Sequence, residues 1–147
     1  MAETNQQFKF EIASPERVVM KEVVKQVTAP TVMGEITILH DHVPVVGLLK
    51  AGVIEVVTVD GRREVMAVSG GLIEIMAGKV VVLADTAEKA AELDEARIEE
   101  AKKRAETLKE DARHEDDVEF ARLSAMIEKE VARGMAVKKW KKININN

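Results

Sequence analysis

The sequence predicts an α+β fold, in which an N-terminal antiparallel β-sandwich is followed by a C-terminal antiparallel two-helix hairpin. Up to residue 84, short runs rich in Val and Ile are punctuated by Gly, as strands require. After Asp85, Ala, Glu, Lys and Arg dominate, with no Pro and a single Gly. We therefore expect two domains, a β-sandwich over residues 1–85 and an α-helical hairpin with a basic C-terminal tail over residues 86–147.

The strands of the first part are predicted from alternation and from apolar runs. Phe8, Phe10 and Ile12 alternate with polar residues. The remaining runs occupy residues 18–27, 36–39, 44–49, 53–59, 63–68 and 80–83. Residues 53–59 and 80–83 are apolar on both faces, which suits two packed sheets better than one sheet facing water.

Dipeptides that end in Gly predict the turns between these strands. Asp60-Gly61 separates residues 53–59 from 63–68, and Asp-Gly is a strong hairpin signal because both turn positions take positive φ. A second hairpin is expected at Ala77-Gly78. We interpret Ser69-Gly70-Gly71 as a bend between strands, because no helix follows it that could aim amides at a phosphate.

Two helix starts are predicted by an Asp with a Glu three residues later, at Asp85 and at Asp116. Residues 112–115 allow only a short connection, so the helices should be antiparallel. The expected apolar stripe of the first helix is Ala90, Leu93, Ala101, Ala105, Leu108 and Ala112, and that of the second is Phe120, Leu123, Ile127, Val131 and Met135.

The Ala-rich hairpin buries little apolar area, so we expect it to depend on a neighbour for stability. That neighbour could be the sandwich, a partner protein or a ligand. A segment stabilised by exchangeable neighbours can switch between arrangements.

Composition excludes several classes of function. The net charge is −4 with 33% charged residues, so we expect no nucleic-acid partner. No apolar run is long enough to span a bilayer, and residues 1–7 carry no hydrophobic signal core, so membrane association is expected only through a partner. The absence of Cys excludes disulfides, thiolate zinc sites and a thiol nucleophile.

No catalytic constellation is visible, and we expect no catalytic residues. A Gly-x-Ser-x-Gly motif, a P-loop and a paired-carboxylate pocket are all missing from the sequence. His40 and His42 would leave the same face of an extended chain beside Asp41, the minimum for a metal site. Without third and fourth ligands, a loop or a protein-contact histidine is favoured and no metal is expected. A small metal-dependent hydrolase remains an alternative.

Two basic features of the second part leave alternatives open. Arg97 places a cation on the apolar stripe of the first helix, either as a snorkelling residue paired with Asp94 or as an anion-binding group. Residues 138–142 hold four Lys around Trp140, the only Trp of the chain. This cluster is either a solvated, frayed terminus or a segment that docks into an acidic groove of a partner.

Several motifs in this order resemble the epsilon subunit of bacterial and chloroplast ATP synthases, whose mitochondrial counterpart is called delta. They are the loop from Gly34-Glu35 to Pro44, Gly52, Ser69-Gly70-Gly71, Val82-Leu83-Ala84-Asp85-Thr86-Ala87-Glu88 and Leu93-Asp94-Glu95-Ala96-Arg97. Departures are His40-Asp41, where the family usually has Pro-Gly, Ile98 in place of Ala, and Lys129 where an Arg is usual.

The resemblance implies a non-catalytic central-stalk subunit of a proton-translocating ATP synthase. Such a subunit couples the gamma subunit to the membrane c-ring, contacts the alpha/beta catalytic subunits and inhibits ATP hydrolysis through its C-terminal helices. It is a peripheral protein on the cytoplasmic face of the bacterial plasma membrane. No cofactor is required, and ATP is a possible regulatory ligand. The alternative is a free-standing nucleotide-sensing protein with its ATP site on the hairpin.

The resemblance also assigns residues. Glu35 and His42 are expected to contact the c-ring, in keeping with the tendency of loops to present side chains without disturbing a core. The residues that match the family's ATP site are Glu88, Asp94, Arg97, Arg104, Arg122 and Arg133.

Overall fold

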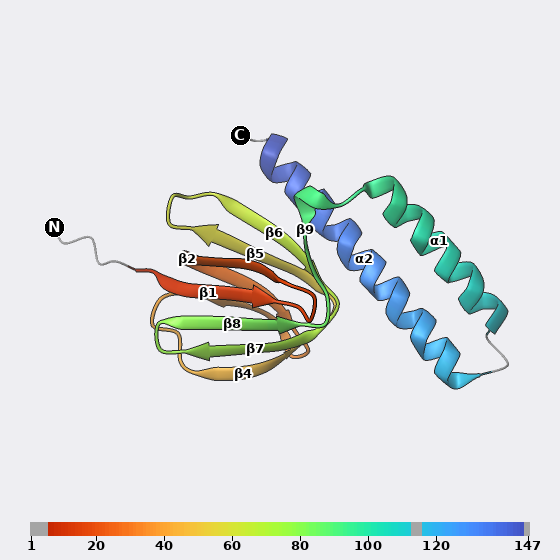
Figure 1. Cartoon of the computed structure of the whole chain (residues 1–147), viewed down its shortest axis with the longest axis horizontal. Helices are drawn as coiled ribbons and strands as arrows, with labels where there is room; N and C mark the ends of the chain where they lie inside the picture. Colours follow the sequence, from red (N-terminus) through yellow and green to blue (C-terminus); the bar gives the residue numbers. More distant parts are fainter. Residues whose placement is uncertain (1–5, 113–115, 146–147) are drawn as a thin grey trace.

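The predicted α+β fold is confirmed by a computed structural model, which describes residues 6–112 and 116–145. In this part of the chain nine strands come first and two long helices follow (Figure 1). The strands are β1 (Phe8–Ala13), β2 (Val18–Thr31), β3 (Gly34–Ile38), β4 (Val45–Leu49), β5 (Gly52–Thr58), β6 (Arg63–Val68), β7 (Gly71–Met76), β8 (Lys79–Ala84) and β9 (Ala87–Lys89).

The strands curl around one apolar core. Their order is β1-β8-β7-β4-β2-β5-β6-β9, with β3 paired to β2. Because β1 also pairs with β2, the strands wrap into a flattened sandwich. One pairing departs from the predicted antiparallel sheet, since β1 runs parallel to β8. The predicted alternation of Phe8, Phe10 and Ile12 is confirmed, because all three side chains are buried in the core.

Gly71 is required by its backbone. Its φ is 135°, and a Cβ there would lie 2.2 Å from the carbonyl oxygen of Leu83 on the neighbouring strand. A side chain at this position would therefore collide with the backbone of β8. The bend predicted at Ser69-Gly70-Gly71 is confirmed.

The turn at Asp60-Gly61 is also confirmed, but only one of its residues has positive φ. Gly61 has φ of 87°, whereas Asp60 does not lie in this region. Residues 59–62 separate β5 from β6, and the Gly61 amide donates to the Thr58 carbonyl at 3.0 Å. Hydrogen bonds from the Thr58 hydroxyl and the Arg62 guanidinium lower the pKa of Asp60 to about 2. The connection is four residues long rather than two, so one positive φ, at Gly61, is sufficient.

The helix start predicted at Asp85 is wrong. Residues 87–89 instead form β9, which pairs with the edge of β6, and a 3₁₀ turn follows at Ala90–Glu92. The first helix, α1 (Glu95–Ala112), begins nine residues later than predicted, with Asp94 rather than Asp85 before its first residue. An unpaired strand edge offers backbone partners over several residues, which outweighs a local capping motif. The second predicted start is confirmed, because Asp116 accepts the amide of Val118 at 2.9 Å and α2 spans Asp117–Ile145.

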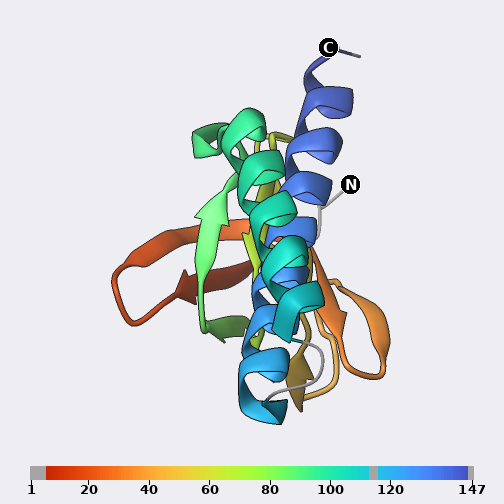
Figure 2. The same ribbon diagram turned by 90° about the vertical axis from the view of Figure 1, so that its right-hand side faces the viewer.

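The two helices lie side by side, with α2 between α1 and the sandwich (Figure 2). Leu123 and Ala105 are buried as predicted. Four predicted stripe residues are exposed, namely Leu108, Phe120, Val131 and Met135, which corrects the predicted stripes. Ile98, Ala132, Ala136 and Val137 are buried instead. The reason is that α2 contacts both α1 and the β5–β6 surface, so its buried face is wider than a single stripe. Within the predicted connection, residues 113–115 lie outside the described residues. Neither described helix is long and apolar enough to cross a membrane.

Candidate functional site at the seam between sandwich and hairpin

Glu88 and Arg133 join the last strand of the sandwich to the second helix. Arg133 donates from Nε at 2.8 Å and from Nη2 at 2.5 Å to the Oε1 atom of Glu88. A third guanidinium nitrogen, Nη1, donates to Glu130 Oε1 at 2.6 Å. The two carboxylates and the guanidinium are all largely shielded from solvent. Two of the predicted ATP-site residues, 45 positions apart, are thus brought into direct contact.

The charge of Arg133 is strongly stabilised at this position. Burial alone would lower the pKa of its guanidinium, but hydrogen bonds and the negative charges of Glu88 and Glu130 outweigh burial and raise the pKa above its ordinary value. Arg133 therefore stays cationic, and it can exchange a carboxylate partner for another anion.

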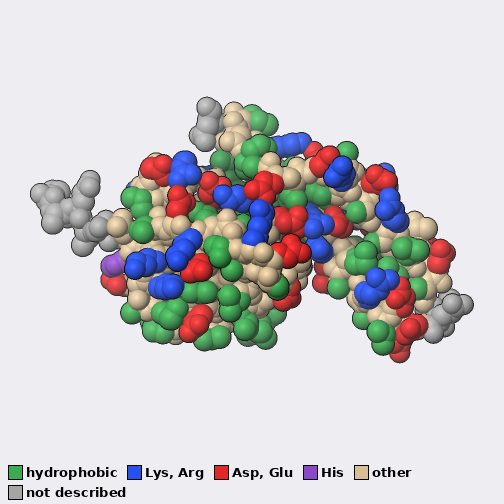
Figure 3. Space-filling view, viewed as in Figure 1, with side chains coloured by type: hydrophobic (Ala, Val, Ile, Leu, Met, Phe, Trp, Pro, Cys, Tyr) green, Lys and Arg blue, Asp and Glu red, His purple; other side chains and the backbone are tan. Residues whose placement is uncertain are grey.

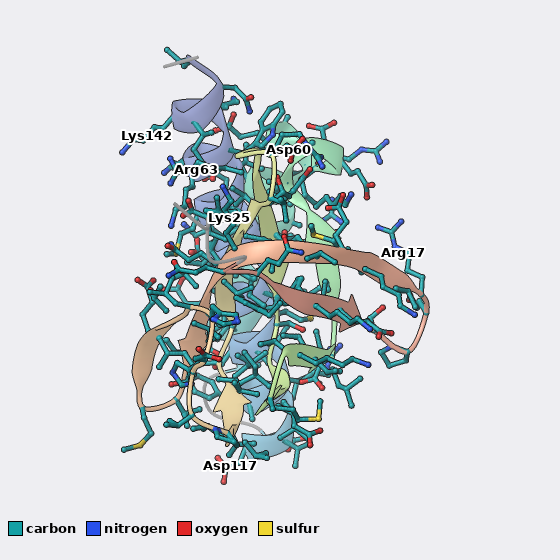
Figure 4. All side chains as sticks on the ribbon, turned by 90° about the vertical axis from the view of Figure 1, so that its left-hand side faces the viewer. Arg17, Lys25, Asp60, Arg63, Asp117 and Lys142 are labelled. Atoms are coloured by element: carbon teal, nitrogen blue, oxygen red, sulfur yellow. The ribbon has the colours of Figure 1, made fainter. Side chains whose placement is uncertain are left out.

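A cavity of about 310 Å³ opens beside this pair. It is lined by Ser14, Glu16, Arg17, Asp85, Thr86, Ala87, Glu88, Lys129 and Arg133. Arg17 reaches it from the turn between β1 and β2 (Figure 4). Its guanidinium pairs with Glu92 at 2.8 Å. Three cationic side chains line the cavity, one from the β1–β2 turn and two from α2, together with the carboxylates of Glu16, Asp85 and Glu88. An anionic ligand such as a phosphate group would have to replace these carboxylates as the partner of the cations.

One cationic group of this cavity, Arg17, has no signal in the sequence, and Lys129 stands out there only as a departure from the family pattern. Lys129 stands four residues before Arg133 on the same face of α2, so helical spacing could have grouped them. Arg17 is far away in the sequence, and no local pattern marks it as a neighbour. Only the packing of the helix against the sandwich brings it to the seam.

The other predicted ATP-site residues make local pairs. Arg97 is exposed, with Nε 3.9 Å from Asp94 Oδ2, which is the ion pair considered from the sequence. Arg104 pairs with Glu100 at 2.8 Å, and Arg122 pairs with Glu119 at 2.5 Å. Each of these guanidinium groups is therefore held by a carboxylate of its own helix or its cap.

Asp94 caps the first helix. Its Oδ1 accepts the amides of Ala96 at 3.0 Å and Arg97 at 3.4 Å, which satisfies two of the free donors at the start of α1.

We expect Asp94→Ala to lower the free energy of unfolding by about 1 kcal/mol, the usual value of a lost helix cap. Asp94→Asn should retain most of the stability, since an amide oxygen also caps a helix. Urea denaturation followed by far-UV circular dichroism measures both variants. Equal losses for the two variants would show that the cap is not the source of the effect.

The loop with Glu35 and His42 lies away from the seam. Asp41 has φ of 62°, so the chain turns at residues 40–41, and the extended arrangement that would align His40 with His42 is wrong. His40 Nδ1 lies 3.1 Å from Asp41 Oδ2, and His42 Nδ1 lies 2.8 Å from the Val43 carbonyl oxygen. Among the described residues no group of three or more His, Cys, Asp or Glu side chains could hold a metal ion.

His42 belongs to the end of the sandwich that lies opposite the helices. It lines a cavity of about 270 Å³ together with Phe8, Ile38, Leu39, Pro44, Ile75 and the β7–β8 turn at Ala77 and Gly78. That turn lies at the left of Figure 1, whereas α1 and α2 lie at the right. Glu35 is exposed near the start of β3 opposite Pro30, which packs beside Gly52, so it does not share this end with His42. The seam and the end that carries His42 are therefore two separate candidate surfaces.

The sequence model of the family described as "ATP synthase, Delta/Epsilon chain, beta-sandwich domain" matches residues 7–90. This chain belongs to that family. The ATP synthase epsilon chain of Nitrosococcus oceani is 36% identical over 132 residues, which cover 90% of this chain and 93% of the relative. The epsilon chain of Syntrophomonas wolfei is 34% identical over 139 residues, which cover 95% of this chain and 98% of the relative. The resemblance found in the sequence is thereby confirmed.

A further relative and a solved structure agree with this family. The epsilon chain of Dichelobacter nodosus is 46% identical over 101 residues, or 69% of this chain and 71% of the relative. A chain in the Euglena gracilis mitochondrial ATP synthase superposes with a TM-score of 0.75 at 21% identity, covering 86% of this chain and 78% of that chain. At this identity the superposition shows that the fold is shared.

Proposed function

We propose that this chain is a central-stalk subunit of a proton-translocating ATP synthase, which couples the gamma subunit to the membrane c-ring and restrains ATP hydrolysis through α1 and α2. The observation that carries the proposal is the similarity to epsilon chains over nearly the whole length, helices included. The subunit is not itself catalytic and needs no cofactor. It lies at the cytoplasmic face of a bacterial plasma membrane, held there by its partners.

An apolar row on the sandwich supports a contact with the gamma subunit. Leu48 on β4 is the register partner of Leu72 on β7, which in turn is the register partner of Leu83 on β8. All three side chains are exposed, at 57%, 44% and 58%, and Val46 at 70% extends the row. Hydrophobic side chains gather along this side of the sandwich (Figure 3). A continuous apolar patch on a folded domain indicates a protein interface, and here the gamma subunit is its occupant.

The opposite end from the helices supports a contact with the c-ring. His42 offers a polar group there, and Leu39 and Val43 are exposed at 54% and 67%. Glu35 lies nearer the other end of the sandwich, because its register partner Pro30 packs beside Gly52, where β5 begins. A turn that projects from a rigid sandwich can bind a partner without altering the core.

Replacing Glu35 and His42 by Ala should weaken assembly and lower ATP-driven proton pumping in membrane vesicles, while the fold of the isolated chain stays intact. His40→Ala is the matched control, because it removes a neighbouring imidazole that pairs with Asp41 instead. Proton pumping is followed with a pH-sensitive dye, and the fold by circular dichroism. Unchanged pumping in the double variant would remove the c-ring contact from this loop.

The regulatory role is supported by the way in which α2 rests on the sandwich. The contact combines a small apolar cluster, which includes Ala67, Ala136 and Trp140, with two ion pairs, and it is separate from the main core of the sandwich. ATP bound in the seam cavity would stabilise the docked hairpin, because a ligand favours the state that holds its site together.

The alternative function is a free-standing nucleotide sensor. It is favoured by one observation, namely that Arg17, Lys129 and Arg133 line the seam cavity without any partner chain. Purification of the tagged chain from native membranes separates the two functions. Gamma, alpha and beta subunits should accompany a central-stalk subunit, whereas a sensor should be recovered without them.

A further inference from the structure

The outward face of β5 carries a carboxylate in an apolar setting. Ile54 and Val56 are fully buried in the sandwich core, so Glu55 between them points to the opposite face. Its register partner on β6 is Val65, which packs with Ala67, Ala90 and Ala136 under α2. Glu55 is nevertheless only 7% exposed. Because α2 packs on β5 and β6, the hairpin rather than the sandwich covers this carboxylate.

Each oxygen of Glu55 has a cation of different origin. Oε1 accepts a hydrogen bond from Arg63 Nε at 2.7 Å, within the sheet. Oε2 lies 2.7 Å from Lys139 Nζ, which comes from α2. Arg63 is labelled beside the C-terminal part of α2 in Figure 4. Lys139 is thus an ion-pair partner that Glu55 has only while the hairpin is docked.

The placement of Lys139 also corrects an expectation from the sequence. Residues 138–142 lie within α2, so they do not form a frayed terminus. Trp140 packs against the cluster of Val65, Ala67, Ala90 and Ala136. Lys141 pairs with Glu95 at the start of α1. The basic segment therefore holds the hairpin against its own sandwich.

Glu55 remains charged in this position. Burial raises the pKa of its carboxyl, but hydrogen bonds from Lys139 and Arg63 outweigh burial and place the pKa below its ordinary value. A charged carboxylate under an apolar helix opposes docking unless each oxygen has a partner. Breaking such a pair from one side costs more than replacing both members by apolar groups.

We propose that Glu55 and Lys139 form an ionic clasp that selects the docked position of α2 on the sandwich. A slip of α2 by one turn would bring Met135 or Ile143 to the place of Lys139 and leave Oε2 of Glu55 without a cation. Only the observed register therefore pairs the carboxylate. This clasp rests on the proposed regulatory function of the hairpin and names the contact that controls it.

The test uses the full chain and a thiol reporter beneath α2. The chain has no Cys, and Val65 is 1% exposed, so Val65→Cys introduces a single thiol that reacts only when α2 lifts. In this background Lys139→Met should raise the rate of alkylation by iodoacetamide about tenfold or more, because Oε2 loses its partner. Lys138→Met is the matched control, since Lys138 is exposed on the same helix.

A second-site variant separates the clasp from ordinary packing. Adding Glu55→Val to Lys139→Met should return the alkylation rate close to that of the parent, because no unpaired carboxylate remains. Arg63 is half exposed and stays hydrated in this variant. Quenching of Trp140 fluorescence by acrylamide should be strongest in Lys139→Met and close to the parent value in the other variants. Circular dichroism checks that each variant is folded.

Two results would overturn the clasp. One is an equal alkylation rate for Lys139→Met and Lys138→Met, and the other is a failure of Glu55→Val to restore protection. Both are measured on the isolated chain without ATP synthase. A negative result would therefore leave the regulatory role standing, since that role is tested separately by hydrolysis in the assembled complex.

Discussion

Arg133→Ala should weaken ATP binding to the isolated chain by about tenfold to a hundredfold, because a charge-assisted hydrogen bond contributes about 1.5–3 kcal/mol. The guanidinium of Arg133 donates hydrogen bonds to Glu88 and to Glu130, which fix its position at the wall of the seam cavity. A bound triphosphate would replace part of the interaction with Glu88 and place its negative charge between Arg133, Lys129 and Arg17.

Arg97 is expected to contribute to the same binding. Its side chain is 87% exposed and lies 3.9 Å from Asp94, outside the lining of the seam cavity, so its contribution requires the side chain to turn toward the bound nucleotide. Arg97→Ala should also lose affinity. Equal affinity of Arg97→Ala and the parent would show that Arg97 is a surface residue paired with Asp94.

Isothermal titration calorimetry with ATP measures these variants. Lys25→Ala is the matched control, because it removes one exposed positive charge from β2, outside the seam (Figure 4). Trp140 quenching is recorded on each variant, so that weaker binding through lifting of α2 can be told from loss of a direct contact. Unchanged affinity of Arg133→Ala with a docked hairpin would remove the ATP site from the seam.

Removal of the hairpin after Lys89 should leave a sandwich that melts cooperatively. The main core cluster contains only residues between Phe8 and Ala87, with no buried member from α1 or α2. Differential scanning calorimetry tests this expectation. A chain that ends at Asp85 is the informative comparison, because it lacks β9 and its buried Ala87, and we expect it to melt at a lower temperature. A disordered chain in both cases would contradict the proposed division into two domains.

In the assembled complex the same truncation should raise the rate of ATP hydrolysis. The hairpin contacts the rest of the chain at β5, β6, β9 and the 3₁₀ turn. Its removal therefore leaves the proposed gamma and c-ring surfaces intact. ATP-driven proton pumping should therefore persist. Equal hydrolysis rates with and without α1 and α2 would remove the regulatory role.

The strands and one helix start could be predicted from local chemistry. Alternation at Phe8, Phe10 and Ile12 and the glycine turn at residue 61 are determined by steric preferences of a few neighbouring residues. Asp116 was predicted as a cap and acts as one. The same motif at Asp85 failed, because residues 87–89 pair with the edge of β6. A local pattern cannot show that a distant strand edge is available.

Strand and helix patterns were enough to predict the α+β fold class, and the motifs were enough to indicate the family. The contacts of Arg133 with Glu88 and of Lys139 with Glu55 could not be predicted in this way. These partners are far apart in the chain, and their contacts exist because α2 packs across β5, β6 and β9. Side-chain periodicity indicates which face of a strand or helix is apolar, but it carries no information about which charged residue another element will place opposite. That choice depends on packing across the whole molecule, which sets the register of α2 on the sandwich.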